Sequence, residues 1–141
     1  MIDIENIVFE NVAKAVQAVY PKAFVTSEKT DAPPSFPCVC VTEEDNSTHR
    51  GSLDTSLIEN NANIMYSLSI FTNEKNGKKS TAKRIANIAD MAMQNMKFTR
   101  IMLSPIPNAD TSIFRIEGRY TAVVSAGKTE NDNTVYQMYR Q

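Results

Sequence analysis

The chain has 141 residues, of which 42% are hydrophobic and 22% are charged, and its net charge is −1. These values are typical of one globular domain, and they argue against disorder and against the overall basic character of nucleic-acid-binding domains. No apolar run is long enough to span a bilayer, and acids stand near the N-terminus where a secretory signal needs positive charge. We therefore expect an intracellular protein with no membrane partner.

The first half of the chain predicts a helix and then strands. Apolar residues recur at helical spacing near the N-terminus, up to the point where Pro21 disfavours helix at Tyr20. Farther along, apolar and polar residues alternate as in strands. The proline-rich segment 28–37 and the patternless polar segment 46–60 predict loops. We expect the helix at residues 3–20 and strands at residues 23–27, 38–45 and 61–73.

The second half of the chain predicts a helix and a β-hairpin. Gly77 ends the long strand, and the amphipathic segment after it carries small residues suited to close packing on a sheet. Two strands follow, joined by a short turn at 108–110, and Gly118 within the second predicts a bulge or a close backbone approach. The chain then becomes polar before it ends in aromatic residues. We expect the helix at 80–96, the strands at 97–108 and 111–126, and a tail at 127–141.

This order of elements predicts the fold class. Runs of strands with one helix between them are typical of α+β domains, in which neighbouring strands pair antiparallel. We expect a mostly antiparallel sheet flanked by two helices, in a single domain that covers residues 1–126. The aromatic tail at 127–141 needs a surface to pack on, either on its own domain or on a neighbouring subunit.

Both cysteines and the only histidine lie close together in the sequence. Cys38 and Cys40 point to one face of a predicted strand, and His49 follows nine residues after Cys40. Zinc sites generally need four ligands, with cysteines spaced two to four residues apart, and redox motifs have the spacing C-x-x-C. We therefore expect no metal here, and we predict that both thiols are small buried groups facing a helix. A metal or enzyme site built on these three residues is the alternative.

No catalytic pattern stands out elsewhere in the sequence. A Ser-His-Asp triad would depend on His49, and the glycines form no phosphate-binding loop. Glu43 and Glu44 are adjacent in a strand and point to opposite faces, which is poor geometry for acid–base catalysis. We expect a protein that is not an enzyme and that needs no cofactor.

Charge is distributed unevenly along the chain. Residues 28–60 contain seven acids and two bases, whereas residues 73–84 contain five bases and one acid. These segments form either two solvated faces or complementary surfaces that meet between copies of the protein. The basic segment is also the best candidate for nucleic-acid binding. Together with two tail aromatics, the candidate interface residues are Glu43, Glu44, Asp45, Arg50, Asp54, Lys75, Lys78, Lys79, Lys83, Arg84, Tyr136 and Tyr139.

Four stretches together carry a resemblance that covers residues 2–126. They are IENIVFENVAKAVQAVYP, PSFPCVCVTEEDNST, NIMYSLSIFTNEKNGKKSTAKRIANIADMAM and FTRIMLSPIPNADTSIFRIEGRYTAVV. In their order along the chain and in their residue patterns they resemble a family of small proteins from the tail modules of long-tailed phages and prophages of Gram-positive bacteria. The members are tail terminator, tail completion or minor capsid proteins.

The resemblance implies a structural role in virion assembly. Proteins of this family cap the tail tube as a ring, typically a hexamer, and so end tail elongation and form the head–tail joining surface. The implied fold is a small sheet flanked by helices, without catalytic residues or a cofactor. The implied partners are the tail tube protein and the head–tail connector or stopper protein, and DNA passes through the lumen without specific binding. The implied location is the tail–neck junction of the virion, after assembly in the host cytoplasm. A connector or stopper protein of the phage neck is the alternative.

Overall fold

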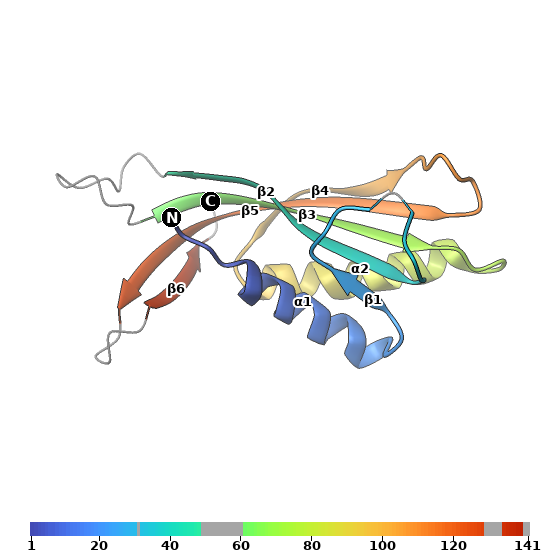
Figure 1. Cartoon of the computed structure of the whole chain (residues 1–141), viewed down its shortest axis with the longest axis horizontal. Helices are drawn as coiled ribbons and strands as arrows, with labels where there is room; N and C mark the ends of the chain where they lie inside the picture. Colours follow the sequence, from blue (N-terminus) through green and yellow to red (C-terminus); the bar gives the residue numbers. More distant parts are fainter. Residues whose placement is uncertain (31, 49–60, 129–133, 140–141) are drawn as a thin grey trace.

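The computed structural model describes residues 1–30, 32–48, 61–128 and 134–139. Within these ranges the chain forms one layer of helices against one layer of mostly antiparallel sheet (Figure 1). This architecture confirms the predicted α+β class. In chain order the elements are α1 (Glu5–Val19), β1 (Phe24–Thr26), β2 (Cys38–Thr48), β3 (Asn61–Thr72), α2 (Lys78–Asn95), β4 (Thr99–Ile106), β5 (Phe114–Lys128) and β6 (Thr134–Tyr139).

The strand order across the sheet is β1-β2-β3-β5-β4, with β6 paired to β5. Among the described strands, β1 and β2 form the parallel pair, and the other pairs are antiparallel. One edge of β5 pairs with β3 over residues 114–125. Since a strand has only two edges, β4 and β6 share the other one, at residues 115–121 and 123–128 respectively. The end of β5 and β6 thus form an arm that extends past the helices in Figure 1; it is two-stranded where residues 126–128 pair with residues 134–136, beyond the last β3 pair.

Both helices cover the same face of the sheet, and the main core lies between the two layers (Figure 1). Tyr66 meets the ring of Phe98 edge-on, with ring centroids 5.9 Å apart. Burial of each large apolar side chain contributes about 1.5–3 kcal/mol, so this layer contact dominates stability. The predicted apolar faces of both long strands supply the sheet side of the core. Its fully or nearly fully buried members include Val8, Val12, Val16, Val41, Ile64, Tyr66, Leu68, Ile70, Ile85, Ala89, Met93, Ile116, Tyr120, Ala122 and Val124.

The opposite, outer face of the sheet holds the two cysteines. Cys38 and Cys40 are buried, as predicted, but they pack with Phe71 in a second cluster, away from the helices. The prediction that they face a helix is therefore wrong. Alternation along β2 determines that both thiols share a face, but it does not determine which face the helices cover. Val39 and Val41 point to the helices instead.

Several element boundaries differ from the sequence prediction. Strand β2 continues through residues 46–48, which were expected to begin a loop, and residues 49–60 lie outside the described part of the chain. Helix α2 begins two residues earlier than expected, at Lys78, and β5 continues to Lys128. Antiparallel ladders extend through backbone hydrogen bonds, which need no apolar pattern in the side chains. Neither helix of the described chain is long and apolar enough to cross a bilayer.

Candidate functional site

The adjacent glutamates of β2 lie in different environments. Glu44 lies on the outer face, where its Oε1 is 2.7 Å from Nζ of Lys29 and accepts a 2.7 Å hydrogen bond from the Ser67 hydroxyl. The hydroxyls of Ser67 and Thr42 are 2.8 Å apart. The Lys29 ammonium holds the pKa of Glu44 below its ordinary value. The charge of Glu44 is therefore neutralised within its own chain, which makes it a weak candidate for an intersubunit contact.

Glu43 belongs instead to a group of acids near the start of α1. It is opposite Tyr66 in the β2–β3 ladder, and cross-strand partners share a face, so it lies on the helix side of the sheet. Burial raises the pKa of Glu43, and the negative charges of Asp3 and Glu5 raise it further, followed by that of Asp45. We call Asp3, Glu5, Glu43 and Asp45 the acidic patch; all four residues are exposed. Asp45 follows the bulge in β2 and pairs with Met65, so it lies on the outer face, at the edge of the patch. Two of the four were missed from the sequence because they precede β2 by about forty positions.

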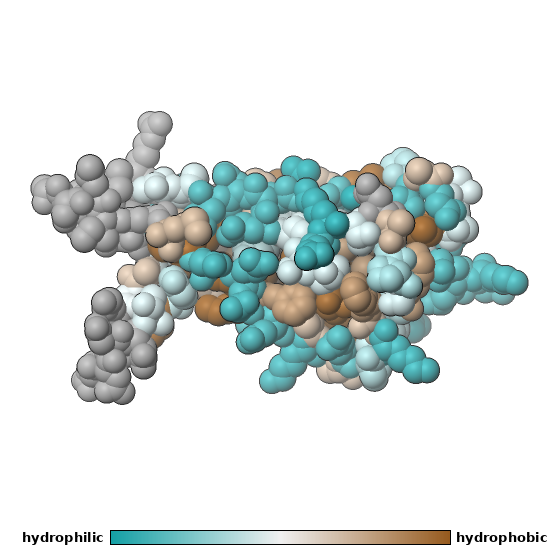
Figure 2. All heavy atoms as spheres, in the orientation of Figure 1, coloured by the Kyte–Doolittle hydropathy of each residue, from teal (hydrophilic) through white to brown (hydrophobic). Residues whose placement is uncertain are grey.

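The basic segment surrounds the turn between β3 and α2, which projects as a hydrophilic end of the molecule in Figure 2. Lys78 differs from its neighbours, because its Nζ donates to the carbonyl oxygens of Thr111 and Ser112, at 3.4 Å each. It therefore ties the start of α2 to the β4–β5 turn. The four other predicted cations are exposed, and we call them the basic turn: Lys75, Lys79, Lys83 and Arg84.

The fold separates the acidic patch from the basic turn. Asp45 pairs with Met65, near the start of β3, whereas the basic turn follows the end of that strand at Thr72. Seven residues of extended chain span roughly 23 Å. At that separation the two surfaces interact weakly within one chain, because salt screens exposed charges beyond about 8–10 Å. Arg50 and Asp54, the remaining charged candidates, lie outside the described residues.

The aromatic residues of the tail lie in the arm. Tyr136 is partly buried against the main core, as is Met138, so the tail packs on its own sheet as strand β6. Val135 and Tyr139 remain 49% and 46% exposed. The arm therefore combines an anchored side with apolar side chains that face solvent.

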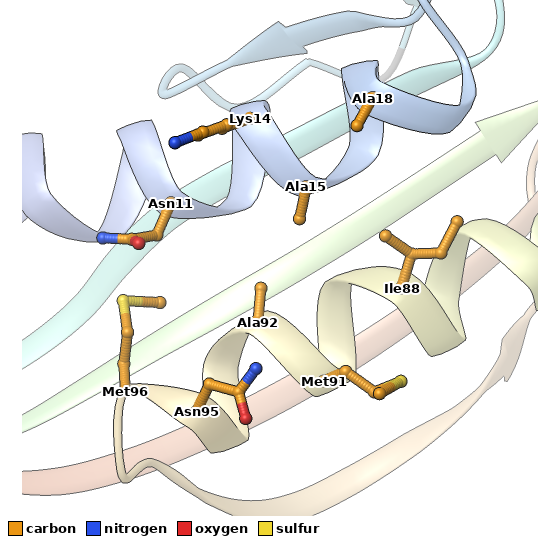
Figure 3. A pocket seen from close by; sticks show the side chains of 9 residues that line it. All are labelled: Asn11, Lys14, Ala15, Ala18, Ile88, Met91, Ala92, Asn95 and Met96. Atoms are coloured by element: carbon orange, nitrogen blue, oxygen red, sulfur yellow. The ribbon is translucent and has the colours of Figure 1, made fainter.

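An open groove runs between α1 and α2 on the side away from the sheet (Figure 3). Its volume is about 510 Å³. Ala15 and Ala92 face each other across it in Figure 3, and these small side chains leave the space between the helices unfilled. Met91 is 58% exposed at its border. The other lining residues are Asn11, Lys14, Ala18, Ile88, Asn95 and Met96.

Sequence periodicity did not predict this groove. The methionines of α2 lie in different environments, and Met93 is fully buried in the core. Met96 is partly buried and contributes to the groove, and Met91 lies on the exposed border. Periodicity gives the direction of a side chain around one helix, but the width of the gap depends on how far apart the two helices pack.

Two buried groups of ionisable side chains lie elsewhere. Asp90 accepts hydrogen bonds from Tyr120 and Gln94 and pairs with Arg100. On the outer face, the Cys38 thiol and its neighbour interact: the pKa of Cys38 is raised by its hydrogen bond to Cys40 and by burial, and that same hydrogen bond lowers the pKa of Cys40. Among the described residues, no three or more His, Cys, Asp or Glu side chains are arranged to hold a metal ion.

Comparison with known proteins gives no family assignment. No protein-family model matches the chain, and no curated protein matches it.

Proposed function

We propose that this protein is a structural tail terminator of a long-tailed phage, which caps the tail tube as a ring and presents the head–tail joining surface. The sequence resemblance supports this role. The structural observation that carries it is that one chain presents two unlike apolar surfaces, the groove between α1 and α2 and the arm. A heterologous contact joins two different surfaces and closes into a ring when the rotation between copies allows it. This chain presents two different apolar surfaces, the groove and the arm, and such a contact requires two different surfaces.

Charge favours the same head-to-tail arrangement. The basic turn follows the end of β3, roughly 23 Å along the strand from the acidic patch, so the two can meet only weakly within one chain. Contact between the patch of one copy and the turn of the next brings opposite charges together and fixes the orientation of both subunits. We expect six copies in the ring, the number that the resemblance implies.

The proposed ring leaves a lumen for DNA. Tight binding of duplex DNA requires several Lys or Arg contacts to phosphates. The net charge of the chain is −1, and in this proposal the basic turn is engaged between subunits. DNA would then pass without specific binding. The tail tube protein lies on one side of the ring and the head–tail connector or stopper protein on the other, at the tail–neck junction of the virion.

A charge-swap experiment tests the subunit contact. Lys79→Glu with Lys83→Glu should reduce ring formation, measured by native mass spectrometry and sedimentation, and leave the monomer folded. Adding Glu43→Lys with Asp45→Lys should restore rings. Lys22→Glu, an exposed change away from the basic turn, is the matched control. Normal assembly by the first double variant would rule out the charge contact.

Electron microscopy of a phage that lacks this gene tests the function itself. Tails of abnormal length, detached from filled heads, would establish a tail terminator. Tails of normal length beside unattached heads would assign the protein to the connector or stopper role. Infectious particles of normal appearance would exclude both roles.

A further inference from the structure

Two thiols lie side by side on the outer face of the sheet. The Sγ atoms of Cys38 and Cys40 are 4.0 Å apart, and both side chains are buried. Zinc–thiolate bonds are about 2.3 Å long, so an ion with bonds of that length can bridge sulfurs up to roughly 4.6 Å apart. The separation in this protein falls inside that limit without any movement of the backbone.

A polar cavity reaches one member of this pair, Cys40. Its volume is about 190 Å³, which is several times the roughly 30 Å³ that one water molecule occupies in the liquid. Cys40 lines the cavity together with two cationic side chains, Lys29 and Arg115. Arg115 lies over the ring of Phe71, 5.2 Å from its centroid, and so the guanidinium is positioned beside the sulfurs.

The charges around the cavity discriminate between metal ions. Positive side chains repel a divalent cation more strongly than a monovalent one. They also stabilise a complex whose total charge is negative. A monovalent ion held by two thiolates forms a complex of charge −1, next to the Arg115 guanidinium. Glu117 also lines the cavity and Glu44 contacts Lys29, so these two carboxylates balance the two cations in formal charge. The discrimination therefore rests on Arg115, whose positive charge acts on the Cys40 thiol.

We propose that Cys38 and Cys40 form a binding site for one soft monovalent cation, Cu(I), held by both sulfur atoms. Soft thiolate ligands select Cu(I), and two thiolates complete the coordination of this ion, whereas a structural zinc ion requires four ligands. Two S–H bonds break and two Cu–S bonds form: Cu⁺ and two thiols give a bis-thiolate complex of charge −1 and two protons. No group is oxidised or reduced.

A competition experiment under anaerobic conditions tests this site. The full chain is titrated into the coloured Cu(I) complex of bicinchoninate, and loss of colour measures transfer of the ion. We expect one Cu(I) per chain. Cys38→Ser and Cys40→Ser should each weaken Cu(I) binding more than 100-fold. That loss is larger than the 10–100-fold expected when a residue that only hydrogen-bonds to a metal ligand is replaced. Arg115→Gln should weaken Cu(I) binding about tenfold.

Two controls separate the pair from other possible ligands. Met91→Leu removes an exposed thioether and His49→Ala removes the only imidazole, and both variants should bind as the original chain does. X-ray absorption of the loaded original chain should show two sulfur ligands and no nitrogen, which tests the site even if a serine variant fails to fold. Failure of the original chain to take Cu(I), retention of binding by both serine variants, or a nitrogen ligand would each overturn the proposal.

Discussion

The phenolic hydroxyl of Tyr120 donates a 2.6 Å hydrogen bond to Oδ1 of Asp90, and both side chains are buried. The other carboxylate oxygen accepts a 2.8 Å hydrogen bond from Gln94 and lies 3.1 Å from Nη1 of Arg100. Burial and the bond to Asp90 raise the pKa of Tyr120. These contacts join α2 to β5 and β4, so a single carboxylate links one helix to two strands of the sheet.

Removal of the Tyr120 hydroxyl should therefore destabilise the fold. Tyr120→Phe should lower the free energy of unfolding by about 1.5–3 kcal/mol, because Asp90 loses a hydrogen bond to a charged group. Tyr66→Phe is the matched control. Tyr66 is equally buried, but its hydroxyl has no hydrogen-bond partner among the described residues. We expect that variant to be as stable as the original chain or more stable in urea denaturation. Equal losses in both variants would contradict the assignment.

The two adjacent glutamates of β2 should respond oppositely to neutralisation. Glu44→Gln should lower the free energy of unfolding at neutral pH by about 1 kcal/mol, a modest value because Lys29 is largely exposed and water screens the pair. The folded-state pKa of Glu44 is below its ordinary value, so its contribution is present above about pH 4.5 and is lost as the pH falls through the folded pKa.

Glu43→Gln should instead raise the free energy of unfolding at neutral pH. The folded-state pKa of Glu43 is raised, so its ionised form is unfavourable above that pKa, and this penalty disappears as the pH falls towards 4.5. Urea denaturation between neutral pH and about pH 3 measures both differences. A loss of stability at neutral pH in Glu43→Gln would show that the other charges of the acidic patch do not repel Glu43.

Gly118 lies where neighbouring side chains leave little room for a Cβ atom. A Cβ atom at this position would lie 2.8 Å from Cδ1 of Leu103 and 3.1 Å from Cε2 of Tyr120. Gly118→Ala should therefore lower the free energy of unfolding by about 1–3 kcal/mol through overpacking. Gly127→Ala in the same strand is the control, because its nearest neighbour, the Val135 carbonyl oxygen, would be 4.0 Å away. Thermal unfolding followed by circular dichroism compares the variants, and equal Tm values would contradict the expectation.

The groove should be required for assembly and not for folding. Met91→Asp places a charge at the exposed border of the groove, so we expect loss of oligomers in sedimentation with little change in the stability of the monomer. Ile101→Asp is the control, since Ile101 is 55% exposed on β4, outside the groove and the arm. Loss of oligomers in both variants would indicate a contact elsewhere or general damage.

Side-chain alternation accounts for most of what could be predicted of the fold. Ile64, Tyr66, Leu68 and Ile70 occupy every second position of the predicted strand at 61–73, and all four line the core. Alternation is a local property, and it left open which face the helices cover, so the partners of Cys38 and Cys40 were predicted incorrectly. It also left open the partner of β6, which pairs with β5 through backbone hydrogen bonds.

The candidate surfaces were less predictable because they depend on residues far apart in the chain. Alternation correctly predicted that Glu43 and Glu44 point to opposite faces, but it did not predict their partners, which are the acids near α1 for Glu43 and Lys29 for Glu44. Lys78 was grouped with exposed cations, although its ammonium contacts the β4–β5 turn. Each of these assignments requires the tertiary contact, which no local pattern contains.

Strand β5 runs for fifteen residues from the body of the sheet into the arm. The change of partner on its shared edge falls at Ala122, after the last β4 pair and before the first β6 pair. No turn interrupts the strand there, so a force on the tip of the arm is carried as torque along β5 to Tyr120 and the carboxylate that it contacts. The arm is therefore continuous with the strand whose Tyr120 contacts Asp90 of α2, so a subunit bound to the arm would act on the same strand that meets the helix layer.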